Sequence, residues 1–146
     1  LHSNQPPYSL LDRGIEGSVL PYCREHGIAV LVYSPLARGL LTGKFTQSAT
    51  FPPGDSRAEE PRFQGEQLRR NLQKVEKLKV LAAELGKTVA QLAVRWVLDQ
   101  PGVTVALWGA RRPGQIAEAA GVAGWTLTPE VLQRIEAIMQ DGAASL

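Results

Sequence analysis

The sequence predicts an α/β fold built around a parallel β-sheet. Two short apolar runs, residues 28–32 and 103–108, have the nearly continuous hydrophobicity of strands that helices cover on both faces. Segments with helical periodicity lie between and after these runs, and strands that alternate with helices in this way run parallel. A third and shorter strand is expected over residues 1–5, where Pro6 and Pro7 end it.

The first helices are predicted from apolar spacing and from glycines that stop a helix. Apolar side chains on one face predict a short helix around residues 19–23, which Gly27 ends. The longest helix is expected over residues 68–85, where apolar residues recur at three- and four-residue spacing before Gly86.

Three further helices are expected in the second half of the chain. Thr88 and Gln91 form a capping-box pattern, so a helix begins there and stops before Pro101. Another opens at Pro113, because proline suits the first position of a helix. The last helix is assigned to residues 128–139, which start with a threonine cap followed by proline.

A long exposed loop is predicted for residues 46–65. This segment holds Pro52, Pro53, Gly54 and Pro61 with mixed charges, without a regular apolar period. Loops of this length in compact domains are usually lids or binding loops, or else disordered.

Composition restricts the classes of partner. The 16 Lys and Arg residues face 14 Asp and Glu residues and are spread along the chain, which argues against a nucleic-acid partner. No apolar run approaches the ~20 residues that span a bilayer, and no signal-peptide pattern opens the chain. The single cysteine, Cys23, excludes an internal disulfide. We therefore expect a cytoplasmic protein with neither a nucleic-acid nor a membrane partner.

Two glycine-containing loops follow the second and third predicted strands, at residues 33–44 and 109–115. Ligands of parallel α/β folds bind at the carboxyl ends of strands, and glycine, serine and arginine there suit a phosphate. The alternative is that these glycines only permit turns and that the basic side chains are solvated. From the residues alone both interpretations stand, since neither a P-loop nor a G-x-G-x-x-G motif is present.

Residues 5–13, 33–44 and 107–115 together resemble aldo-keto reductases in order and spacing, and residues 124–127 extend the likeness to the bacterial NADPH-dependent, general-stress type. The resemblance implies that residues 1–146 are the C-terminal portion of a (β/α)8 TIM barrel, with its last three strands and their helices. At 146 residues the chain is well short of the roughly 250 of a complete barrel.

The resemblance also implies an NADP (NADPH) site. Gln5 matches the residue that hydrogen-bonds the nicotinamide carboxamide, and Tyr33 matches the aromatic residue that stacks on the nicotinamide ring. Two groups of residues match the pyrophosphate loop and the segment around the adenosine 2′-phosphate and adenine. These are Ser34, Leu36, Arg38, Gly39, Leu40 and Lys44 in the first group, and Gly109, Ala110, Arg111, Gln115 and Glu118 in the second. Many relatives have asparagine where Ala119 stands, so a contact to the adenine is expected to be missing.

The family's catalytic Asp, Tyr, Lys and His have no counterpart in this sequence, so we assign no catalytic residue and no metal ligand. Tyr8 is interpreted as a packing residue and His26 as a helix-end residue. The first hypothesis is an NADPH-dependent carbonyl reductase that acts on a carbonyl substrate only if the N-terminal strands are supplied. The alternative is a non-catalytic partial-barrel module that self-associates or binds a dinucleotide, and a product without function is a third. A homo-oligomer is expected, because a partial barrel leaves strand edges and an apolar face open.

Overall fold

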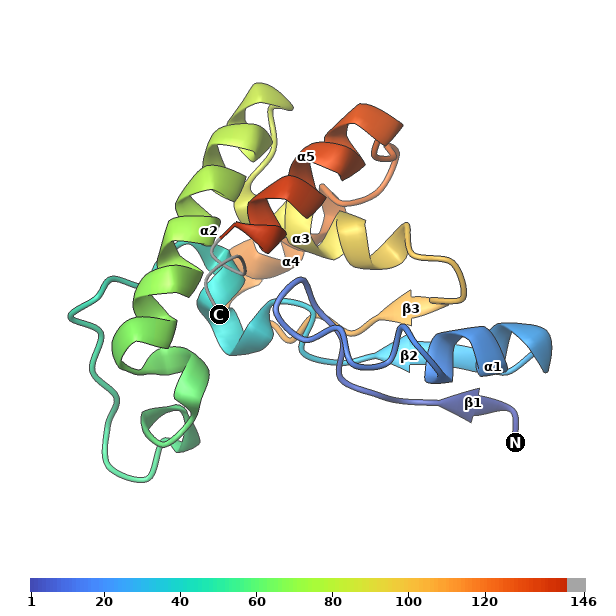
Figure 1. Ribbon diagram of the computed structural model, residues 1–146, viewed down its shortest axis with the longest axis horizontal. Helices are drawn as coiled ribbons and strands as arrows, with labels where there is room; N and C mark the ends of the chain where they lie inside the picture. Colours follow the sequence, from blue (N-terminus) through green and yellow to red (C-terminus); the bar gives the residue numbers. More distant parts are fainter. Residues whose placement is uncertain (142–146) are drawn as a thin grey trace.

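Three short parallel strands form the centre of the fold. A computed structural model describes residues 1–141 of the chain, so residues 142–146 of the predicted 1–146 unit lie outside the described part. The strands are β1 (Ser3–Asn4), β2 (Ala29–Val32) and β3 (Val105–Ala106), and they form one sheet in the order β1-β2-β3. Ser3 pairs with Ala29, and Leu31 pairs with Val105, in parallel register (Figure 1). The predicted parallel sheet is therefore confirmed.

One face of this sheet is covered by helices and the other is partly open. Val30 and Val32 are fully buried, whereas Ala29 and Leu31 between them are only half-buried, as the two-residue period of a strand requires. Further apolar side chains near the ends of β2 and β3 are also partly exposed, namely Tyr33, Val105 and Leu107. The sheet therefore presents an incompletely covered apolar face.

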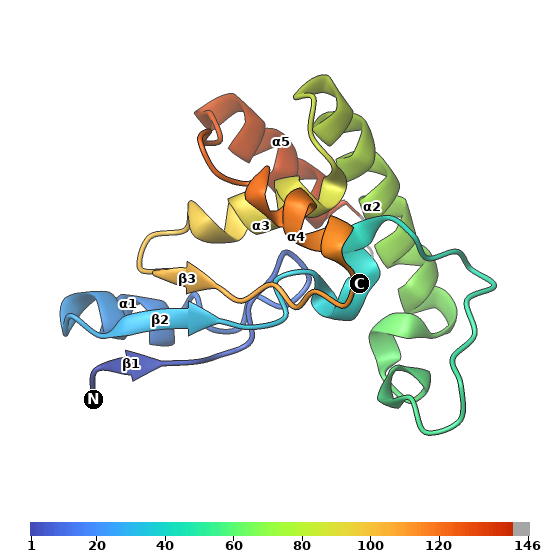
Figure 2. The same cartoon turned by 180° about the vertical axis from the view of Figure 1, so that it is seen from behind.

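Each of the three helices after β1 and β2 overlaps the range that the sequence predicts for it. Helix α1 (Val19–Glu25) packs against β2 and lies in front of it in Figure 1 and behind it in Figure 2. The chain reverses after α1 at Gly27, whose φ of 64° suits glycine. Helix α2 (Gly65–Glu84) is the longest and precedes Gly86. Helix α3 (Val89–Leu98) opens with the predicted capping box of Thr88 and Gln91 and packs against β3.

The last two helices also begin at their prolines. Helix α4 covers Pro113–Ala120, and α5 covers Pro129–Gln140 with Thr128 as its cap, in the stretch assigned to a helix at 128–139. Helix α5 packs against α2. No helix within residues 1–141 is both long and apolar enough to cross a membrane.

A polar network fastens α5 to the segment between β1 and α1. Arg13 donates two hydrogen bonds to the carboxylate of Glu136 in α5, at 2.8 and 2.9 Å, and it also pairs with Glu16. The guanidinium of Arg13 lies 5.0 Å from the ring centre of Trp96, and the Tyr8 hydroxyl donates to Glu16 at 2.7 Å. The network therefore joins the first and last parts of the described chain.

Residues 46–65 are mostly exposed, but they are not an unstructured loop. Two short 3-10 helices interrupt them, η2 (Ser56–Ala58) and η3 (Pro61–Phe63). Phe63 is buried, and its ring contacts those of Phe51 and Phe45 at centroid distances of 5.3 and 5.5 Å. This aromatic cluster anchors the segment to the body of the protein through the buried Phe63.

Candidate functional site

The two loops singled out in the sequence come together at one end of the sheet. The chain leaving β2 and the chain leaving β3 run side by side towards η1 (Ala37–Thr42) and the start of α4 (Figure 2). They enclose a cleft of about 820 Å³. Its lining residues come from three segments of the chain, 34–44, 54–57 and 107–118. A cleft of this size lies in the range of small-molecule and cofactor sites, and its position at the carboxyl ends of parallel strands is where such folds bind ligands.

The first wall of the cleft, the 34–44 loop, has an unusual backbone. Within residues 1–141, the non-glycine residues with positive φ are Ser34 (55°), Ala37 (48°) and Arg38 (58°), and all three lie in this loop. Gly39 follows with a φ of 97°. Left-handed backbone costs a non-glycine residue about 1–2 kcal/mol, so the surroundings must hold it in place. Such conformations, next to right-handed residues, are found where backbone N–H groups gather around an anion.

The second wall is the start of α4 and the residues before it. The Gln115 side-chain oxygen accepts hydrogen bonds from the backbone N–H groups of Arg111 and Arg112, at 2.7 and 3.0 Å. Gln115 therefore fixes the backbone of the 109–115 loop through its oxygen. Glu118, further along α4, accepts a hydrogen bond from the Thr88 hydroxyl at 2.9 Å, which ties α4 to the start of α3.

Basic side chains outnumber acidic ones around the cleft. Arg38, Lys44, Arg57 and Arg111 line it, against Asp55 and Glu118. Arg38 and Arg57 are paired with carboxylates, whereas the side chains of Lys44 and Arg111 make no ion pair or hydrogen bond with any residue of the described 1–141 range. Two cations without a partner face the same cleft, so its electrostatics favour an anionic ligand.

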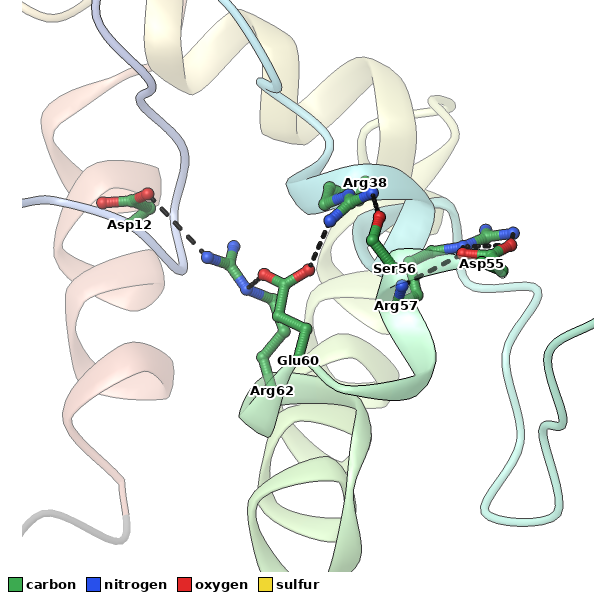
Figure 3. Close-up of polar contacts among 7 residues, drawn as sticks. All are labelled: Asp12, Arg38, Asp55, Ser56, Arg57, Glu60 and Arg62. Carbon is green, nitrogen blue, oxygen red and sulfur yellow. Dashed lines mark hydrogen bonds and ion pairs between the residues drawn. The ribbon is translucent and has the colours of Figure 1, made fainter. Parts of the chain in front are cut away.

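A third wall, residues 54–57, was not assigned to the site from the sequence. Asp55 caps η2 and receives hydrogen bonds from the side chain and backbone of Arg57, and these lower the pKa of Asp55 to about 2 (Figure 3). The Arg57 guanidinium also lies 4.8 Å from the centre of the Phe51 ring. The length of the 46–65 segment was the available sequence signal, because long loops are often binding loops.

Ten of the residues expected to bind the cofactor line the cleft. They are Ser34, Leu36, Arg38, Gly39, Lys44, Gly109, Ala110, Arg111, Gln115 and Glu118. Leu40 does not line it, because its side chain is fully buried in the core. Gln5 and Tyr33 also lie outside the cleft lining, at the ends of β1 and β2.

The position of Tyr33 follows from strand geometry. The backbone N–H of Tyr33 donates to Pro6 and its carbonyl accepts from Tyr8, which continues the pairing of the first two strands. Since Val32 points into the helical layer, Tyr33 points to the opposite face, and 44% of its surface is exposed. Its ring therefore lies on the open face of the sheet.

Neither Tyr8 nor His26 has the surroundings of a catalytic group. Tyr8 is fully buried, with its ring centre 5.4 Å from that of Trp96. Burial and the hydrogen bond to Glu16 raise the pKa of Tyr8, which opposes proton transfer near neutral pH. His26 caps α1 with its backbone N–H bonded to the Tyr22 carbonyl. These positions confirm the packing and helix-end interpretations.

The chain is similar to proteins of one family along nearly its whole described length. Residues 1–140 match the family described as the Aldo/keto reductase family. The aldo-keto reductase YhdN of Bacillus subtilis is 47% identical over 142 residues, which are 97% of this chain and 43% of that protein. The NADH-specific methylglyoxal reductase of Escherichia coli is 41% identical over 78% of this chain and 34% of that protein.

A solved structure shows the same arrangement of elements. The glycerol dehydrogenase AKR11B4 from Gluconobacter oxydans superposes with a TM-score of 0.93 at 42% sequence identity, over 99% of this chain and 44% of that chain. The predicted fold class, a portion of a (β/α)8 barrel, is thereby confirmed. This chain spans less than half the length of the relatives that it matches.

Proposed function

The chain belongs to the aldo/keto reductase family, and we propose that it binds NADPH in the cleft between the 34–44 and 109–115 loops. In this proposal it supplies the cofactor-binding part of a reductase that converts aldehydes or ketones to alcohols. NADPH would provide the hydride for this reaction.

The observation that carries the proposal is the meeting of two cations without partners in one cleft. Lys44 is the last residue of the 34–44 loop and Arg111 lies in the 109–115 loop, and both line the cleft. A dinucleotide with an additional phosphate presents anionic groups at two places, so it can engage both loops at once. The arginine favours NADPH over NADH, because a guanidinium pairs with a phosphate in two-pronged fashion.

The 34–44 loop suits the pyrophosphate and the 109–115 loop suits the adenosine 2′-phosphate. Ser34 and the strained backbone around Arg38 can donate to the pyrophosphate, with Leu40 contributing only through its backbone. Arg57, which lines the cleft beside them, is a further candidate to face the phosphates.

The nicotinamide would then extend from the cleft towards the open face of the sheet. There Tyr33 offers an exposed aromatic surface on which the nicotinamide ring can stack, and Gln5 at the end of β1 offers an amide for the carboxamide group. One ring face would rest on Tyr33, and the other would remain available to a carbonyl substrate.

We propose that the proton donor for this reaction lies outside the matched portion of the barrel. Tyr8 is buried and hydrogen-bonded to Glu16, and His26 is part of a helix end remote from the cleft lining. The carbonyl substrate would therefore bind only with the N-terminal strands of such a barrel in place. We also propose a cytoplasmic location, which the free, buried Cys23 supports.

The second candidate function is a non-catalytic partial barrel that self-associates or binds a dinucleotide. The partly exposed Tyr33, Val105 and Leu107 on the sheet favour it, because an apolar face of this kind is usually covered in a stable protein. Aldehyde-dependent oxidation of NADPH separates the two candidates.

A cleft-filling variant tests the cofactor site itself. A Cβ added at Gly109 would meet no atom within 4 Å, so we expect Gly109→Leu to place a side chain in the cleft with little effect on the fold. Gly114→Leu is the matched control, because Gly114 has equally open surroundings but does not line the cleft. We expect fluorescence titration to show NADPH binding to the wild type and to Gly114→Leu and a large loss in Gly109→Leu. Equal affinities in both variants would contradict the proposed site.

A further inference from the structure

We propose that Glu60 is a positioning residue that fastens residues 54–62 across the 34–44 loop through Arg38, and that it thereby keeps the cofactor cleft in shape. Glu60 does not line the cleft, whereas Arg38 and Ser56, on the two sides of this fastening, do. The consequence for cofactor binding rests on the proposed function, while the fastening itself does not depend on a ligand.

The contacts form a chain of alternating charges (Figure 3). Arg38 donates one hydrogen bond to Glu60 at 3.0 Å and another to the Ser56 hydroxyl at 2.5 Å. The other carboxylate oxygen of Glu60 pairs with Arg62, and Arg62 in turn lies 3.9 Å from Asp12. Glu60 therefore lies between two arginines, and the chain of contacts joins the 34–44 loop, the 54–62 segment and the loop after β1.

The burial of Glu60 distinguishes it from its neighbour. The Glu60 side chain is only 17% exposed, and it pairs with two guanidinium groups. Glu59, the preceding residue, is exposed and forms no ion pair within residues 1–141. The sequence thus offers two adjacent glutamates with the same charge, of which one is engaged and the other is not.

The Arg38 backbone explains why this fastening matters for the cleft. Arg38 has a φ of 58° and a ψ of 30°, and it follows Ala37, which also has a positive φ. Such a conformation persists only where neighbouring contacts hold it. Both terminal nitrogens of the Arg38 guanidinium donate to residues of the 54–62 segment, so releasing Arg38 would loosen both the segment and the strained backbone.

A positioning role and a simple charge effect predict opposite results. If Glu60 acted only as a negative charge near a phosphate site, its removal would strengthen NADPH binding. As a positioning residue, its removal loosens the cleft and weakens binding. Arg62→Gln also removes a group that holds Glu60, but both explanations predict weaker NADPH binding for it, so its ligand-free cleavage rate is the informative measurement.

The experiment compares Glu60→Gln with Glu59→Gln, which carries the same charge change, and adds Arg62→Gln as an independent variant. The ligand-free proteins are first cleaved with trypsin, since Arg57 offers a cleavage site in the segment in all of them. We expect cleavage after Arg57 to be about two- to fivefold faster in Glu60→Gln and Arg62→Gln, the scale of a partly exposed ion pair. The Glu59→Gln rate should equal that of the wild type, and the thermal transition should be the same in all four proteins.

NADPH titration of the same proteins then tests the effect on the cleft. Binding about two- to fivefold weaker is expected for Glu60→Gln and Arg62→Gln, but not for Glu59→Gln. Tighter binding by Glu60→Gln, or cleavage equal to that of Glu59→Gln, would overturn the positioning role. Should the wild type itself fail to bind NADPH, the proposed function fails, and the cleavage rates still decide whether Glu60 fastens the segment.

Discussion

Replacing Arg111 with alanine is expected to separate NADPH binding from NADH binding. Arg111 lines the cleft, is exposed, and has a side chain without a partner in the described residues. Its removal therefore leaves the free protein unchanged and affects only a contact made to the ligand. Since NADH lacks the 2′-phosphate, its affinity should barely change.

The magnitude follows from the exposure of the side chain. A hydrogen bond to a charged group contributes about 1.5–3 kcal/mol, and solvent around an exposed guanidinium reduces this value. We therefore expect a loss of about 1–2 kcal/mol in NADPH binding, which is roughly a five- to thirtyfold increase in Kd. High salt should diminish the difference, because it screens exposed charges.

Arg112→Ala is the matched control for this experiment. It removes the same charge one residue later, but Arg112 does not line the cleft. Fluorescence titrations measure the affinities of the wild type and the two variants for NADPH and for NADH. Equal losses for the two nucleotides in Arg111→Ala, or the same NADPH loss in Arg112→Ala, would refute the assignment of the 2′-phosphate to Arg111.

Three further outcomes are expected. Burial of Glu16 opposes its ionisation, but hydrogen bonds from Arg13 and Tyr8 lower its pKa below the ordinary 4.5. The ionised Glu16 therefore stabilises the folded protein fully above pH 4.5, and this stabilisation is lost as the pH falls through the lowered pKa of the folded state. Urea unfolding of Glu16→Gln should therefore differ from the wild type more at pH 7 than at pH 3, and a constant difference would contradict this. The 146-residue chain should oxidise no NADPH in the presence of aldehyde, and turnover that survives repurification would mean that it holds a proton donor. Light scattering should give a mass above the 15.8 kDa monomer, because the sheet face around Leu107 is partly open; a folded monomer at micromolar concentration would refute this.

Much of the local structure could be predicted from the sequence. The Thr88 and Gln91 capping box, the glycine after α1 and the prolines that open α4 and α5 all act on their immediate neighbours, so their spacing along the chain is sufficient. The two loops that line the cleft were found in the same way, because they follow apolar runs whose strand character is visible in the sequence.

The pairing of charges was decided only by the tertiary structure. Arg38 and Glu60 are 22 residues apart, and Arg13 and Glu136 are 123 apart, with no local pattern that selects one carboxylate over another. The same folding left Lys44 and Arg111 without partners, which distinguishes them from the other basic residues of the cleft.

The division between what the sequence determined and what the tertiary structure decided has a physical reason. Backbone caps and apolar periods depend on contacts within a few residues, so the sequence alone determined the α-helices, the strands and the two loops that follow β2 and β3. The third wall of the cleft depended on Phe51 and Phe63 packing with Phe45, which brought residues 54–57 beside Arg38. Such packing is set by which apolar surfaces meet in three dimensions, and only the tertiary structure decided it.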